Sequence, residues 1–106
     1  MTVRYKKAKA DLTTTNATAV LTPANATTAI IKSILVSEDS GNADTITLTI
    51  TAGSDVFSLF KVKAVSANTS IELLTAPLVL AESEILKAAA ATASRIHIVV
   101  SYMEIS

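Results

Sequence analysis

The stretch DSGNADTITLTIT, residues 39–51, decides the fold. Its second half alternates threonine with Ile46, Leu48 and Ile50, which is the period of a β-strand that buries one face. The branched Cβ atom of threonine also favours a pleated sheet over a helix. Residues 39–44 contain a glycine and an asparagine, which tolerate the positive φ of a hairpin turn. We therefore expect a turn followed by a strand whose three aliphatic residues face the core.

The same turn carries oxygen-bearing side chains, so a calcium site is the alternative interpretation. Asp39, Asn42 and Asp44, with Glu38 beside them, are candidate ligands, and calcium takes six to eight oxygens. The spacing does not fit the twelve-residue EF-hand loop, because no glutamate stands at the closing position. A hairpin turn explains the same residues without a metal. We favour the turn and keep calcium as the alternative.

Period-two alternation recurs along the rest of the chain, and turn residues separate the segments. The expected strands are Val3–Ala10, Ala17–Thr22, Thr28–Ser37, Thr45–Thr51, Val56–Val65, Ser70–Leu74, Ile85–Ala91 and Ser94–Ile105. Seven to eight short antiparallel strands with frequent turns indicate an all-β fold, a single small β-sandwich that is jelly-roll-like. A length of 106 residues suits one such domain.

Residues 82–94, ESEILKAAAATAS, leave two alternatives open. Four consecutive alanines give this segment a high helix propensity. It ends just before the alternating segment IHIVVSYMEI, however, and a sheet can override local propensity. We expect a strand here and keep a short helix as the alternative.

The last expected strand has two distinct faces. Its core face carries Ile96, Ile98, Val100 and Tyr102. Its outer face carries Arg95, His97, Val99 and Ser101. We expect the outer face to meet solvent or a neighbouring subunit.

The strand at residues 28–37 is apolar on both sides. Strict alternation puts Ile30, Ile34 and Val36 on one face and Ile31 and Leu35 on the other. Such a strand is typically central in the fold or lies against a partner. Ile31 and Leu35 are therefore candidate anchors of an interface.

Charge is balanced overall, with nine basic and nine acidic residues, but it is uneven along the chain. The first ten residues hold four basic side chains and no acid: Arg4, Lys6, Lys7 and Lys9. We divide the chain into residues 1–12, a basic N-terminal arm or an edge strand guarded by lysines, and residues 13–106, the sandwich. An arm would dock on an acidic partner, and Tyr5 would join that contact. Net neutrality argues against nucleic acid as the partner.

The residues argue against most enzyme classes. Cysteine is absent, which excludes thiolate chemistry and zinc–cysteine sites, and His97 is the only histidine. Two glycines cannot form a phosphate-binding loop, so no cofactor is expected. The longest apolar stretch is broken by Pro77 and is shorter than a membrane helix requires, and no secretory signal is visible. We expect a soluble protein that is not an enzyme and binds no membrane.

Three segments together resemble small virion structural proteins of tailed bacteriophages. They are TPANATTAIIKSILVSEDSGNADTITLTI (22–50), NTSIELLTAPLVLAESEILKA (68–88) and IHIVVSYMEIS (96–106). The order and spacing of the segments carry the resemblance, which covers about residues 17 to 106. The chain departs from that pattern at residues 81–84, where such proteins have a Gly-Asp turn, and in its basic N-terminus.

The resemblance implies a non-enzymatic virion component made in the bacterial cytoplasm and carried on the particle surface. One placement is a capsid decoration, or cement, protein that binds the major capsid protein as a homo-oligomer, for which we expect a trimer. The alternative is a tail, neck or fibre-associated protein. The partner contact would use the basic residues, Tyr5, Ile31 and Leu35. A carbohydrate-binding module remains an alternative from another class, although only Tyr5 and Tyr102 could stack on a sugar.

Overall fold

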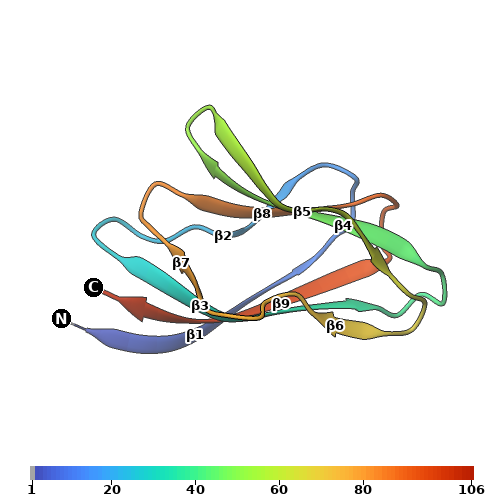
Figure 1. The fold of residues 1–106 in the computed structure, drawn as a ribbon, viewed down its shortest axis with the longest axis horizontal. Helices are drawn as coiled ribbons and strands as arrows, with labels where there is room; N and C mark the ends of the chain where they lie inside the picture. The colour runs from blue at the N-terminus through green and yellow to red at the C-terminus, as the bar shows by residue number, and fades with distance from the viewer. Residues whose placement is uncertain (1) are drawn as a thin grey trace.

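The computed structural model describes residues 2–106, which fold into nine strands in two packed antiparallel sheets (Figure 1). Sheet A contains β1 (Val3–Asp11), β9 (Ile96–Ile105), β3 (Thr28–Glu38), β6 (Ser70–Glu72) and β7 (Leu78–Leu80). Sheet B contains β2 (Thr18–Leu21), β8 (Ile85–Ala90), β4 (Asp44–Ala52) and β5 (Asp55–Val65). The short strand β7 was not expected, so the count of seven to eight strands was low.

The strand order is that of a jelly roll, as expected. The chain can be followed as one long hairpin whose tip is the β4–β5 turn: β3 pairs with β6 and β7, β2 with β8, and β1 with β9. Rolling this hairpin up adds β9 to β3 and β8 to β4. The result is two sheets in the orders β1-β9-β3-β6 and β2-β8-β4-β5, with β7 at the same edge of β3 as β6.

The core lies between the two sheets and consists almost entirely of aliphatic side chains. Strand β4 shows why: Ile46, Leu48 and Ile50 are buried, and the threonines between them are half-buried on the outer face of sheet B. Burial of each aliphatic side chain stabilises the fold by about 1.5–3 kcal/mol. The alternation that predicted this strand is confirmed.

Two further expectations are confirmed. In β9, Ile96, Ile98 and Val100 are buried, and Tyr102 packs against the core. The alanine-rich segment forms β8 with alternating burial, so the helix alternative is wrong. Pairing with β2 and β4 on both sides supplies backbone hydrogen bonds that override the helix propensity of alanine.

The faces of β3 were assigned wrongly because the strand contains a bulge. Its pairing with β9 shifts register between Ile31 and Ser33, where Lys32 is the extra residue. Ile31 and Ile34 therefore both face the core, fully buried, and Ile30 moves to the outer face. Ile31 is a core residue and not a surface anchor. Leu35, which is 40% exposed, does lie on the outer face, as expected.

The N-terminal segment is an edge strand rather than a free arm over Val3–Asp11, since β1 pairs with β9 along its whole length. Leu12 then enters the core, fully buried. The described residues 2–106 form no helix, so they contain none that is long and apolar enough to cross a membrane.

The corner at residues 81–84 is a tight turn without glycine. Ser83 adopts a φ of 74°, a left-handed conformation that glycine reaches without strain. The Ala81 amide donates a hydrogen bond to the Glu84 carboxylate at 2.8 Å, and the Glu84 amide donates one to the Ala81 carbonyl at 3.2 Å. The glutamate thus closes the turn with its own side chain.

Candidate functional site: the outer face of sheet A

Cross-strand register assembles a row of apolar side chains on the outer face of sheet A. Tyr5 on β1 pairs with Met103 on β9, which pairs with Ile30 on β3, which pairs with Val79 on β7. Directly paired residues point to the same side of a sheet, so four strands contribute to one row. Val3 and Ile105 pair in the row beside it.

We call these six residues the apolar patch: Val3, Tyr5, Ile30, Val79, Met103 and Ile105. Tyr5 is 82% exposed and Val79 58% exposed, and Val3 is also exposed. The other three are half-buried by their neighbours within the sheet. A contiguous exposed apolar surface that spans several strands is typical of a protein–protein contact, whereas a single exposed residue is not.

Basic side chains border the apolar patch. Lys7 and Lys9 follow Tyr5 on the same side of β1, since strand residues two apart share a face. The bulge residue Lys32 is exposed and lines one open hollow with Tyr5 and Lys7. The outer face thus combines apolar area with positive charge, a combination that suits an acidic partner surface.

The other two predicted basic residues belong to the opposite side of β1. Arg4 pairs in register with Glu104, and Lys6 forms an ion pair with that same glutamate at 3.2 Å. Glu104 pairs in turn with the buried Ala29, which places all of these side chains on the inner side. The predicted group of four basic residues is therefore divided between the two sides of the strand.

A further outer row contains Lys9, Val99, Leu35 and Glu72. The Glu72 carboxylate accepts hydrogen bonds from the Ser33 hydroxyl, from the Ile34 amide at 2.7 Å and from the Leu74 amide at 3.2 Å. Burial acts to raise the pKa of Glu72, but these hydrogen bonds outweigh it and lower the pKa. The Glu72 carboxylate thus keeps its negative charge, and this row carries one positive and one negative charge, on Lys9 and Glu72.

His97, the single histidine, lies on the outer face of β9, as expected. Its Nδ1 lies 2.6 Å from Oδ1 of Asp11, and its Nε2 lies 3.2 Å from Oδ1 of Asp39. Both ring nitrogens are therefore engaged by carboxylates. The cluster ties β1, β9 and the β3–β4 loop together at one end of sheet A.

The β3–β4 loop is organised by the Glu38 carboxylate, which is almost fully buried at 1% exposure. It accepts hydrogen bonds from the Ser40 hydroxyl and amide, from the Gly41 amide at 3.2 Å and from the Asn68 amide at 3.1 Å. The Ser40 hydroxyl is the main reason that the pKa of Glu38 falls to about 2, and burial opposes the shift. Gly41 supplies the positive φ of the turn, 86°.

The three candidate calcium ligands, Asp39, Asn42 and Asp44, share no common partner. Asp39 contacts His97, and the largely buried Asp44 accepts a hydrogen bond from the Thr92 amide at 3.0 Å. Asn42 is exposed. Within residues 2–106 no group of three or more histidine, aspartate or glutamate side chains is placed to hold one metal ion. Residues 39–43 form the turn that joins β3 to β4, as the favoured interpretation predicts.

Five members of the apolar patch were not predicted from the sequence as surface residues: Val3, Ile30, Val79, Met103 and Ile105. Continuing the outer alternation of β9 past Ser101 leads to Met103 and Ile105, so that signal was present. Ile30 could not be found, because only the pairing with β9 reveals the bulge.

The outer face of sheet A combines exposed apolar side chains with lysines, a composition that suits contact with another surface. A search against known protein families, curated proteins and solved structures finds no match for this chain.

Proposed function

We propose that this chain is a structural protein of a bacteriophage particle, a decoration protein that binds the assembled capsid shell as an oligomer and stabilises it. The observation that carries the proposal is the outer face of sheet A, where the apolar patch lies beside Lys7, Lys9 and Lys32. The resemblance of residues 17–106 to virion proteins of tailed phages supplies the biological setting. Jelly rolls are common in viral capsid proteins, although the fold alone does not determine function.

The mechanism is one of linkage. A protein that binds the assembled shell and not its separated subunits stabilises assembly by mass action, to an extent set by its concentration and affinity. A specific contact requires about 1,000 Å² of buried surface or more, with apolar anchors at its centre. Met103 lies within the patch, and Tyr5, its most exposed side chain, lies beside Met103 on the edge strand β1; these two would serve as the anchors. The lysines at its border would speed association with an acidic shell.

Purified shells that lack the protein provide the test. Wild-type protein is expected to co-sediment with shells, to saturate at a fixed number of copies and to raise the shell's melting temperature. The chain is expected not to bind dissociated capsid subunits. Equal binding to shells and to subunits, or no binding to either, would contradict the proposal.

The alternative placement, in the tail, neck or fibre, would use the same face on a different partner. Copy number separates the two. Hundreds of copies per particle indicate the shell, and three, six or twelve indicate the neck or tail. The exposure of Tyr5 also keeps the carbohydrate-binding alternative testable, since an exposed aromatic ring can stack on a sugar. The other candidate ring, Tyr102, packs against the core, so Tyr5 is the residue on which this alternative depends. A glycan array without hits would remove the alternative.

A further inference from the structure

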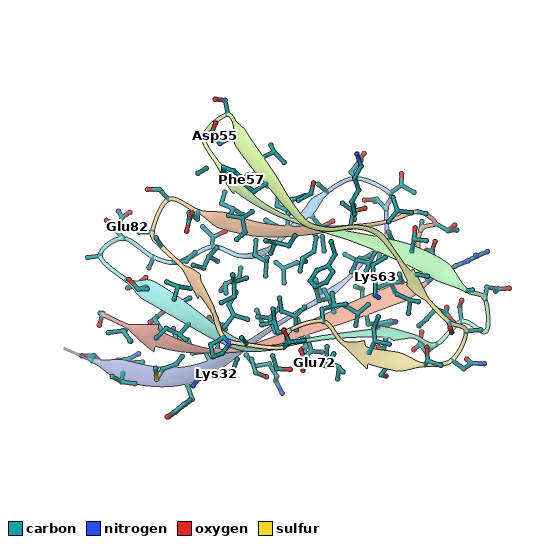
Figure 2. All side chains as sticks on the ribbon, viewed as in Figure 1. Lys32, Asp55, Phe57, Lys63, Glu72 and Glu82 are labelled. Atoms are coloured by element: carbon teal, nitrogen blue, oxygen red, sulfur yellow. The ribbon has the colours of Figure 1, made fainter. Side chains whose placement is uncertain are left out.

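A second apolar surface lies on strand β5, away from the outer face of sheet A. Strand β5 is the edge of sheet B, and its hairpin with β4 projects past the body of the sandwich (Figure 1). Near the tip of this hairpin Val56 and Phe57 are each 63% exposed, and Val62 farther along is 61% exposed. Asp55 and Phe57 mark the projecting tip, and Lys63 lies toward the opposite end of the strand (Figure 2).

Beside the far end of β5 the sandwich is open between its two sheets. A groove of about 440 Å³ lies there, bordered by Phe60, Lys63 and Ala64 of β5 and by Ile71, Glu72 and Leu73 around β6. Its volume is within the range of about 300–1,000 Å³ that holds a compact ligand, and an aromatic side chain fits such a space. The groove combines apolar walls with the positive charge of Lys63 and the negative charge of Glu72.

The tip and the groove belong to one strand, so the tip cannot reach the groove of its own chain. Phe57 and Lys63 are six positions apart, which is about 20 Å along an extended strand. A second copy that runs antiparallel to the first would place each tip beside the other copy's groove. Such a contact is isologous, because the same surface is used twice about a twofold axis.

The charges of β5 select this antiparallel arrangement. Asp55 stands at the tip end, and the other charged residues of the strand, Lys61 and Lys63, stand at the groove end. Antiparallel copies place the acid of each opposite the two lysines of the other, whereas parallel copies would place like charges together.

The backbone of β5 limits the contact to side chains. Its pairing with β4 contains two register shifts, and Val62 adopts a φ of 53°, which is unusual for a β-branched residue. The Val62 amide donates a hydrogen bond to the Thr47 hydroxyl at 3.0 Å within its own chain. Bulges of this kind interrupt the hydrogen-bonding edge and oppose open-ended strand addition.

We infer that this protein forms a twofold dimer through β5, in which Phe57 of each copy, which shares the inner side of the strand with Phe60 and Lys63, covers the groove beside those two residues of the other copy. The dimer uses a surface separate from the outer face of sheet A. An experiment can therefore disprove the dimer and leave shell binding intact, or disprove shell binding and leave the dimer intact. It also predicts pairs as the unit of self-association, in place of the trimer expected from the resemblance.

Sedimentation measures the first consequence. Wild-type protein is expected to dimerise, and Phe57→Ser is expected to weaken the dimer at least tenfold. Val79→Ser is the matched control, since Val79 is similarly exposed on sheet A, and it should leave dimerisation unchanged. Melting temperatures verify that both variants fold. A wild-type monomer at millimolar concentration, or equal effects of the two variants, would overturn the inference.

Cross-linking measures the geometry, because the chain contains no cysteine. An oxidised mixture of Asp55→Cys and Lys63→Cys proteins is expected to give a covalent dimer that contains one copy of each. Either variant alone should stay uncrosslinked. The double variant should form a dimer with two disulfides and nothing larger. Ladders of higher oligomers would indicate head-to-tail association and overturn the twofold arrangement, as would the absence of any mixed dimer.

Discussion

The outer faces of the two sheets differ in composition although both follow the same alternation. On sheet B the outer positions of β4 are threonines, which pair across to Ile85, Lys87 and Ala89 of β8. On sheet A the outer positions of four strands meet in the apolar patch, bordered by lysines. Threonine satisfies both a pleated backbone and water, so these positions of β4 need no cover. The second face has the composition of a contact surface.

The largest expected effect tests how the β3 bulge divides inner from outer residues. Ile31→Ala should lower the free energy of unfolding by about 2–5 kcal/mol, because it leaves a cavity in a fully packed core. Ile30→Ala, one residue away, should cost about 1 kcal/mol or less, since its side chain is only half-buried on the outer face. Chemical denaturation of the two variants measures both. Equal losses would mean that the bulge does not set the faces of sheet A.

The next effect concerns the loop that joins sheet A to sheet B. The pKa of Glu38 is lowered from 4.5 to about 2, so the folded state favours its ionised form. Its contribution to stability is therefore present above pH 4.5 and is lost as the pH falls toward 2. Glu38→Gln should lower the melting temperature at pH 7.

The pH profile supplies the control for that variant. The difference in melting temperature between wild type and Glu38→Gln should shrink below pH 4.5 and be smallest near pH 2. Asn42→Ser, at an exposed and uncharged position of the same loop, should show no such profile. A difference that stays constant from pH 7 to pH 2 would refute the assigned role of the Glu38 carboxylate.

A smaller effect concerns the charge of the two faces. Replacing Lys7, Lys9 and Lys32 by glutamine should weaken shell binding by about 0.2–1 kcal/mol per lysine and reduce its dependence on salt. Lys87→Gln, on the outer face of sheet B, is the matched control and should change neither. The measurement is affinity for shells at several salt concentrations. Unchanged salt dependence in the triple variant would show that the basic border of sheet A takes no part in binding.

Local pattern was sufficient to predict the sandwich and the inner faces of β4 and β9, because alternation is a property of neighbouring residues. The bulge at Lys32 could not be read locally, since it is defined by the pairing of β3 with β9. The same bulge explains the one error among the predicted apolar interface residues. Tyr5 and Leu35 were placed on the outer face correctly, but Ile31 was taken in place of Ile30.

Contacts between segments far apart in the chain could not be predicted from the sequence either. The apolar patch joins Tyr5 to Met103 and Val79, residues that come together only through the register of three strand pairs. The Glu38 carboxylate likewise uses the amide of Asn68, thirty residues away, where the sequence suggested local metal ligands. A cluster of oxygens in one short stretch does not reveal which of them are already hydrogen-bonded.

Competition on shells tests most directly the claim that sheet A carries the binding surface. Wild-type protein is mixed with either Tyr5→Ser/Met103→Ser or Thr47→Ser/Thr49→Ser, and the bound fractions are measured. The sheet A variant should lose binding by about 2 kcal/mol or more, roughly thirtyfold, while the sheet B variant should compete as wild type does. Both variants should retain their folded structure. The account would be contradicted if the sheet A variant competed equally with wild type. It would also be contradicted if only the sheet B variant lost affinity for the shell.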